Sequence, residues 1–294
     1  MSDRPKNKKR KITVFDIVNT AFLLLFAIII FYPFYNAILS SIVTSQEYTL
    51  NPTMLYPRDV TFNNYLIILE NPRIWTGYQN TLIIVFFGVI YSVGMTVCMA
   101  YALSRRNFPG KRVIFLIVLF TMFFSGGLIP LYLLMKDLGL LNSLIGLILL
   151  NGVSPFFMII MKNSFEQIPD SLEEAAKIEG ANDIVVFIRI MLPLQSAMLA
   201  TITLFTATSQ WNSWFYPMLF IKEGRLLPLQ VILRSIIFES ASNVDAISSR
   251  FSETVFATGI KNAAVVVTML PIMCIYPFLQ KYFVKGIMVG AVKM

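Results

Sequence analysis

Six long apolar runs limit the possible folds of this chain more than any other feature of its sequence. They cover residues 12–39, 78–103, 113–135, 141–161, 192–221 and 263–284. Each has about 20 residues or more, the length that an α-helix needs to cross a hydrocarbon layer of roughly 30 Å. Charged residues make up only 14% of the chain, whereas soluble domains usually carry about 25%. We therefore expect an all-α, polytopic membrane protein with about six transmembrane helices.

Composition also excludes several function classes. The net charge of +8 does not indicate a nucleic-acid partner, because the basic residues lie at the ends of apolar runs rather than in one patch. Histidine is absent, which removes the commonest general base and metal ligand. Cys98 and Cys274 lie inside apolar runs and lack the spacing of a metal or redox pair. The chain also lacks a P-loop pattern, so transport is a better prediction than catalysis.

Positive charges predict the orientation of the spans. Sixteen Lys and Arg residues fall on the side of the N-terminus and eight on the opposite side. The positive-inside rule then places both termini and residues 162–191 in the cytoplasm, with residues 40–77 and 222–262 outside. Within the external segments, residues 62–69 and 227–238 have helical patterns. The domain prediction is a basic cytoplasmic arm, 1–11, followed by a single transmembrane domain, 12–294.

The cytoplasmic segment 165–191 predicts two short helices joined by a tight turn. Ser171 and Glu174 have the spacing of a capping box, so the first helix should begin there. Gly180 is placed to end that helix in a left-handed conformation. Ala175 and Ala176 should keep its outer surface slim. Such a wedge suits docking into a groove of another protein.

A second short helix should follow the turn. Asn182 or Asp183 can cap it, its apolar face is formed by Val186, Phe187 and Ile190, and Pro193 marks the entry to the fifth span. A segment of this length either docks a partner or only connects two spans, and the spacing of the residues leaves both interpretations open.

Polar residues within the apolar runs are candidates for a substrate path. They are Asn151, Ser154, Thr206, Ser209, Gln210, Trp211, Asn212 and Trp214. Thr206, Ser209 and Gln210 are three and four residues apart, so they share one face of a helix. Polar groups are costly in lipid, so this face should point into the bundle, where it either bonds to neighbouring helices or lines the path.

The sequence Glu174-Ala175-Ala176 followed by Gly180 and then Leu192-Pro193 resembles the EAA signature of binding-protein-dependent ABC importer permeases. Residues 124–130, 211–214, 282–286 and 290–293 resemble the carbohydrate-uptake branch, which is related to maltose-type permeases. The similarity extends from Thr13 onward. Glu179 stands where the family usually has Asp, and Ala197 where it commonly has a later proline; both departures are mild.

This resemblance implies a type I ABC importer permease fold in a multi-pass protein of a bacterial plasma membrane. The implied function is ATP-driven import of a sugar or oligosaccharide delivered by an extracellular solute-binding protein. The implied partners are a second homologous permease subunit and two ATPase subunits, with ATP and Mg bound by the ATPases and no cofactor in this chain. The implied ATPase-coupling residues are Glu173, Glu174, Ala175, Ala176, Gly180, Ala181 and Phe187.

Several alternatives remain. An ion-gradient-driven secondary transporter would need ionisable residues within the spans, and these spans hold almost none apart from Asp16 at the start of the first. A permease for a non-sugar solute and a structural subunit without a path are the others. Trp211 and Trp214 either contact the sugar or belong to an interfacial aromatic belt. The identity, length and charge of the sugar stay open, as does the question of which permease carries its site.

Overall fold

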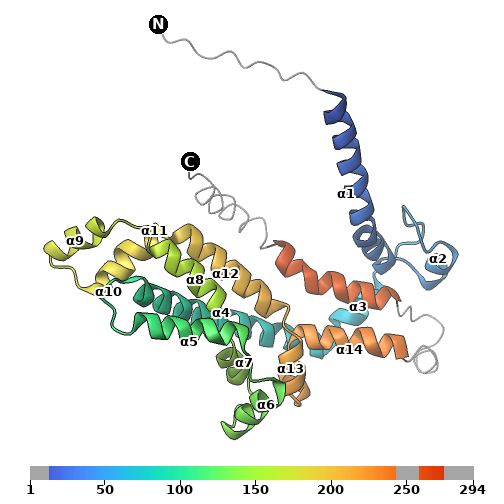
Figure 1. Cartoon of the computed structure of the whole chain (residues 1–294). Coiled ribbons are helices and arrows are strands. Elements are labelled where there is room, and N and C mark those ends of the chain that lie inside the picture. Colours follow the sequence, from blue (N-terminus) through green and yellow to red (C-terminus); the bar gives the residue numbers. More distant parts are fainter. Residues whose placement is uncertain (1–12, 243–257, 275–294) are drawn as a thin grey trace. The chain divides into compact units, whose positions relative to one another are not determined.

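The computed structural model describes residues 13–242 and 258–274, which form helices joined by short loops and one isolated antiparallel bridge between Val43 and Val60. The predicted arm 1–11 lies outside the described residues. The chain divides into two compact units, one of residues 1–68 and 240–266 and the other of residues 69–239 and 267–294 (Figure 1). Each unit is described by itself.

The first unit begins with α1 (Val14–Ser41), which matches the first predicted span within two residues at each end. Its start is fixed by a capping box: the amide of Asp16 donates to Thr13 Oγ1 at 3.3 Å, and the amide of Thr13 donates to the Asp16 carboxylate at 2.9 Å. None of its most apolar window is buried within the chain. A helix of this kind is suited to lie against lipid.

Two short helices follow α1 in the same unit, α2 (Ser45–Leu50) and α3 (Asn63–Leu69). The helical pattern predicted at 62–69 is confirmed by α3, whereas α2 was not predicted. The loop between them is held by the Glu47 carboxylate, which accepts from the amides of Arg58 and Asp59 at 2.5 and 2.6 Å. The buried Glu47 side chain thereby satisfies two backbone donors of the loop without regular structure.

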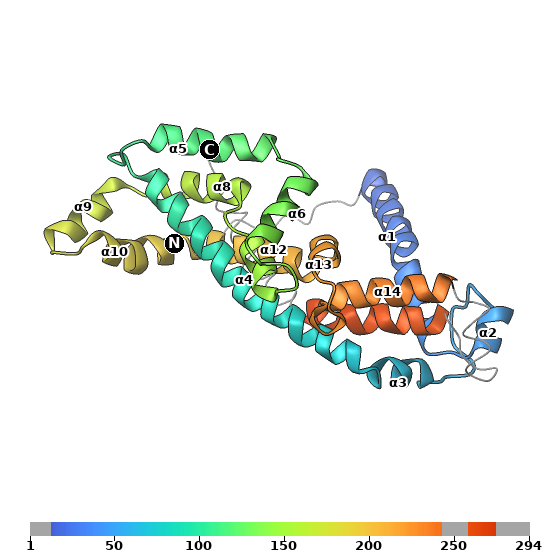
Figure 2. The same ribbon diagram turned by 90° about the horizontal axis from the view of Figure 1, so that it is seen from below.

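The second unit is built on α4 (Pro72–Ser104), a single helix of 33 residues. α7 (Leu144–Leu150), α8 (Pro155–Phe165) and α12 (Ser196–Trp211) all pack against it. Figure 2 shows α4 running the length of this group of helices, with α9 and α10 at its C-terminal end.

Three of the predicted spans are broken rather than continuous, which corrects the sequence analysis. The 113–135 run is divided into α5 (Lys111–Phe123) and α6 (Leu128–Asp137), which are bent by 115°. Gly127 in the break has φ +89°, a conformation that favours glycine. The 141–161 run bends by 52° between α7 and α8, where Gly152 and Pro155 interrupt the helix.

The fifth run, 192–221, has two breaks. The helical segment Asp183–Leu194 meets α12 at an angle of 81°, and α13 (Phe215–Phe220) is separate from α12. Within the described part of the chain, two helices are long and apolar enough to cross a membrane, or five if each bent pair counts as one span. The sixth predicted run, 263–284, is described only by helix Thr258–Cys274, and its remainder lies outside the described residues. The helical pattern predicted at 227–238 is confirmed by α14 (Leu229–Ser242), and its external location stays a prediction.

The main core of the second unit joins α4 and α8 to the short helices α9 (Asp170–Ile178) and α10 (Asp183–Val186). Its buried residues include Leu103 of α4, Phe165 of α8, Ala176 of α9 and Val186 of α10. Burial of such apolar side chains stabilises a packing arrangement by about 1.5–3 kcal/mol for each large residue. The helix pair is therefore anchored to the spans by its own core contacts.

Candidate functional site

A polar cavity of about 260 Å³ lies where the break between α7 and α8 faces α4 and α12. Of the predicted path residues, it brings together Asn151, Ser154, Thr206, Ser209 and Gln210, from two separate runs of the sequence. Irregular backbone at membrane depth is tolerated where it is buried in protein or lines a cavity. This break lines a cavity and so meets the second condition.

Hydroxyl groups of α4 hold the broken backbone in place. Ser92 Oγ donates to the carbonyl of Gly152 at 2.8 Å, and the amide of Ser154 donates to Thr96 Oγ1 at 3.1 Å. Ser92 also lines the cavity. The sequence analysis missed both α4 residues, although hydroxyls four residues apart within an apolar run indicate a polar stripe on one helix face.

Gln210 is the least satisfied polar residue of this cavity. Gln210 is only 6% exposed. The nitrogen and the oxygen of its side-chain amide both lack a hydrogen-bond partner within the described protein. The amide lies against Gly88 of α4, where an added Cβ would approach Gln210 Oε1 to 2.3 Å. An unsatisfied buried polar group costs about 1–3 kcal/mol. The Gln210 amide therefore has unused hydrogen-bonding capacity beside the cavity.

The other three path candidates, Trp211, Asn212 and Trp214, do not line the cavity. Trp211 is buried against Tyr78, with ring centroids 6.2 Å apart, and its indole N–H has no partner among the described residues. Burial excludes Trp211 from an interfacial belt, so that interpretation is wrong for this residue. Asn212 is exposed and donates to the carbonyl of Thr208 within its own helix. Trp214 is partly exposed, and the Arg234 guanidinium stacks 3.8 Å from its ring centroid.

The helix pair α9–α10 has the predicted turn. Gly180 has φ +87°; its amide donates to the carbonyl of Lys177, and the amide of Ala181 donates to the carbonyl of Ala176. These two bonds form a Schellman motif, which ends α9 as predicted. Asn182 caps α10 by accepting from the amide of Val185 at 2.9 Å.

The predicted capping box at the start of α9 is wrong. The helix begins one residue earlier, at Asp170, with Pro169 at its N-cap and no side-chain capping bond. Ser171 therefore lies inside the first turn, and Glu174 is exposed to solvent. The physical reason is that Pro169, with its fixed φ, sets the extended entry to the helix.

The predicted coupling residues lie on two different faces of the helix pair. Glu174, Ala175 and Gly180 are exposed, and Ala181 is partly buried. Ala176 is buried in the core and does not form the outer surface, which corrects that prediction. The outer surface instead carries two large exposed apolar residues that the sequence analysis did not select, Ile178 and Ile184.

Glu173 and Phe187 also face inward. The centroid of the Phe187 ring lies 4.6 Å from the centroid of the Tyr101 ring in α4. Glu173 forms ion pairs with Arg105 and Lys177. The sequence analysis missed Tyr101 and Arg105, because they lie about 70 residues away along the chain.

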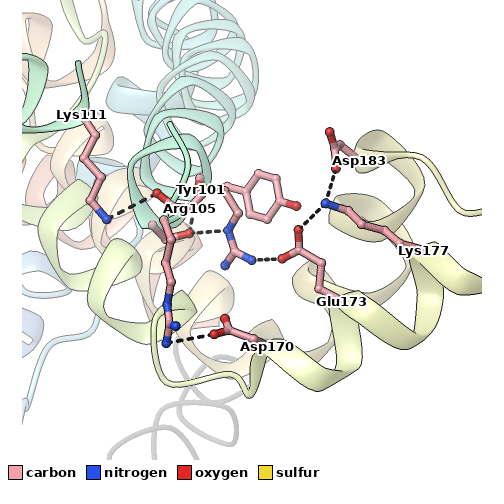
Figure 3. A network of polar contacts seen from close by, with 9 residues as sticks. Tyr101, Arg105, Lys111, Asp170, Glu173, Lys177 and Asp183 are labelled. Carbon is pink, nitrogen blue, oxygen red and sulfur yellow. Dashed lines mark hydrogen bonds and ion pairs between the residues drawn. The ribbon is translucent and has the colours of Figure 1, made fainter. Parts of the chain in front are cut away.

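Figure 3 shows the resulting charge network, in which the Arg105 guanidinium points to Glu173 and Lys177 lies between Glu173 and Asp183. Partial burial alone would raise the pKa of Glu173, but the hydrogen bond from Lys177 and the charge of Arg105 lower it below its ordinary value. Hydrogen bonds to Glu173 and Asp183 raise the pKa of Lys177. Glu173 and Lys177 are thus held in their charged forms.

Comparisons with known proteins agree with these features. A family model described as "binding-protein-dependent transport system inner membrane component" matches residues 86–289. The chain is 38% identical over 281 residues to the polygalacturonan/rhamnogalacturonan transport system permease protein YtcP of Bacillus subtilis (strain 168), covering 95% of this chain and 98% of that protein. It is 28% identical to the arabinooligosaccharides transport system permease protein AraQ of Halalkalibacterium halodurans, covering 91% of this chain and 92% of that one.

A solved structure is also similar to the chain. It is the crystal structure of a bacterial ABC transporter involved in the import of the acidic polysaccharide alginate. A chain of that transporter has 36% sequence identity and a TM-score of 0.87, covering 92% of this chain and 96% of that chain.

Proposed function

The chain belongs to the family of binding-protein-dependent transport system inner membrane components, and on this premise we propose that it is the membrane-embedded permease subunit of an ATP-driven importer of oligosaccharides. The family and the relatives support a transport subunit rather than an enzyme. A second permease subunit, two ATPase subunits that bind ATP and Mg, and an extracellular solute-binding protein complete the proposed importer. Both termini and the α9–α10 pair face the cytoplasm in this proposal.

The composition of the polar cavity carries the proposal. Its described lining offers hydroxyl and amide groups, from Ser92, Asn151, Ser154, Ser209 and Gln210 among others. These groups both donate and accept, so they match the hydroxyls of a sugar. None of the described lining residues is ionisable. An ion-coupled carrier would need such residues along its path, so the lining favours the ATP-driven function.

An acidic oligosaccharide is the finer substrate class that we propose. The names of two relatives refer to polygalacturonan and to alginate. In this chain, Arg234 of α14 lies in the predicted external segment, and its guanidinium stacks on Trp214 at 3.8 Å and on Phe238 at 4.8 Å. No described carboxylate forms an ion pair with it. A guanidinium stacked through its face keeps its N–H edge available for a carboxylate.

Reconstitution of the complete importer tests the function. Proteoliposomes containing this chain, its partner permease, the ATPase subunits and the binding protein should take up oligosaccharides only when ATP is supplied. Gln210→Ala should lower that uptake, because it removes the cavity's unsatisfied amide. Asn212→Ala is the matched control, since this exposed amide lies two residues away and does not line the cavity. Uptake driven by an ion gradient without ATP would refute the proposal.

A parallel comparison tests the acidic class. Arg234→Gln should reduce uptake of oligogalacturonides more than uptake of neutral oligosaccharides. Arg225→Gln is the control, because Arg225 is exposed and already paired with Glu223 at 2.9 Å. Equal uptake of acidic and neutral sugars by both variants would remove Arg234 from substrate selection.

A further inference from the structure

Glu173 and Glu174 are adjacent in sequence, but their side chains have different surroundings. Successive residues of an α-helix point about 100° apart, so Glu174 is exposed while the Glu173 side chain is only 15% exposed. Glu173 meets Arg105, the residue that follows the last turn of α4. A contact on the inner side of the helix pair cannot belong to its outer, docking surface. Glu173 therefore needs a role of its own.

Arg105 is held in a fixed position by the end of α4. Its guanidinium carbon lies 4.7 Å from the centroid of the Tyr101 ring, and its Nε donates to Ser104 Oγ at 3.1 Å. Its backbone carbonyl accepts from Lys111 Nζ at 3.4 Å. With a side chain only 21% exposed, the arginine is oriented by its neighbours before it contacts Glu173. A charged hydrogen bond between oriented groups is stronger than one between mobile surface groups.

The charge contacts continue beyond Glu173 into α10. Lys177 Nζ lies 2.9 Å from the Glu173 carboxylate and 3.0 Å from that of Asp183. One connected set of ion pairs thus joins the end of α4 to both members of the helix pair. The Phe187 ring also packs, tilted by 33°, against the same Tyr101 ring that Arg105 contacts. A sideways displacement of α9 would have to break these contacts or move α4 as well.

α4 leads directly to the polar cavity. Ser92, which lines the cavity, lies 13 residues before Arg105 in the same unbroken helix. At 1.5 Å per residue this separation is about 20 Å. A continuous helix is stiff over that length, whereas the other helices around the cavity are interrupted by bends.

We propose that the Arg105–Glu173 ion pair is the positioning contact that makes the cytoplasmic helix pair and α4 move as one body, so that displacement of α9 by a partner reaches the cavity. Arg105 and Glu173 act through α4 and touch neither substrate nor ATP. The inference rests on the proposed function, because only an ATP-driven partner supplies the displacement. It predicts that loss of the pair separates ATP hydrolysis from transport while leaving the complex assembled.

The variants Arg105→Met, Glu173→Gln and their combination test the proposal in the reconstituted importer. Each should lower the number of sugars imported per ATP hydrolysed by at least about fivefold, the lower end of typical coupling between two sites. The double variant should import no fewer sugars per ATP than the single variant with the lower ratio, because the two side chains act as one unit. Arg105→Lys should restore part of the ratio, since it keeps the charge but loses the second donor, which bonds Ser104.

The ion pair between Arg106 and Asp170 provides a matched control. It joins the same two segments at 2.9 Å, but its side chains are 84% and 51% exposed. Exposed pairs contribute little, so Arg106→Met and Asp170→Asn should keep the wild-type ratio. Co-purification of the ATPase subunits, measured for every variant, separates coupling from assembly.

Three outcomes would overturn the inference. They are a wild-type ratio in both Arg105→Met and Glu173→Gln, an equal loss in the Arg106 and Asp170 controls, and loss of the ATPase subunits from the purified variants, which indicates a merely structural role. Failure of the wild-type complex to import any oligosaccharide is a different result. It would overturn the proposed function first, and the inference with it.

Discussion

Replacing Gly180 by valine tests whether the turn between α9 and α10 transmits ATP-driven movement. Gly180 has φ +87°, and a Cβ added there would meet no atom within 4 Å. The substitution therefore introduces backbone strain without a steric clash. Valine is the demanding choice, because a β-branched residue with positive φ is a genuine outlier.

The energetic cost of Gly180→Val follows from the backbone conformation alone. A left-handed conformation costs a non-glycine residue roughly 1–2 kcal/mol, which reduces the population of the native turn by a factor of about 5–30. Relaxation to negative φ would instead break the two Schellman bonds from the amides of Gly180 and Ala181, each worth about 0.5–1.5 kcal/mol. We expect ATP-driven uptake to fall by a factor in the same range, with the amount of inserted protein unchanged.

Gly139 supplies a matched control, because it ends α6 with the same motif. Its φ is +67°, a Cβ would again meet nothing within 4 Å, and the amides of Gly139 and Leu140 donate to the carbonyls of Lys136 and Met135. Gly139→Val should cost the same backbone energy without uncoupling ATP hydrolysis from uptake. Wild-type coupling in Gly180→Val, or equal uncoupling in Gly139→Val, would refute the role of the α9–α10 turn.

Three further predictions follow from the cytoplasmic helix pair. Glu174→Lys reverses an exposed charge in the second turn of α9, where the influence of the helix dipole has fallen off, so it should weaken ATPase binding in pull-down assays without lowering the thermal stability of the purified chain. Ala181→Cys, in a chain whose two native cysteines have been replaced, should react with an impermeant thiol reagent only after cells are opened; labelling of intact cells contradicts the topology. Because the folded pKa of Glu173 is below its ordinary value of 4.5, its stabilisation should be complete above that pH and lost as the pH falls through the lowered pKa. The melting temperatures of wild type and Glu173→Gln should therefore converge only in acid, and convergence near about pH 6 would be inconsistent with the ion pair.

Local rules predicted the features of this chain that depend on neighbouring residues. The 3.6-residue period and the length of the apolar runs predicted α1 and α4 to within a few residues at most ends, because a long apolar helix needs no distant partner to satisfy its backbone. The left-handed turn at Gly180 and the cap at Asn182 were also predictable, since each is made by bonds within five residues. The EAA motif, read by resemblance, identified the segment that we propose as the docking site.

Local sequence rules failed to predict helix boundaries where two possible helix starts or ends compete. The Ser171–Glu174 pattern has the spacing of a capping box, but Pro169 begins α9 one residue earlier. Likewise, hydropathy averaged over a window cannot distinguish a continuous span from two helices bent by 115° or 52°. Glycine and proline mark the breaks, but their angles depend on what the two halves pack against.

Only the tertiary structure decided which polar residues meet. The sequence identified Asn151 and Gln210 as candidates, and packing of α7, α8 and α12 on α4 brought them to one cavity. It also decided that Glu173 faces Arg105 while the adjacent Glu174 faces solvent. The physical reason is the same in both cases: periodicity fixes the angle between residues on one helix, whereas the face that is buried is fixed by contacts between residues far apart in the chain.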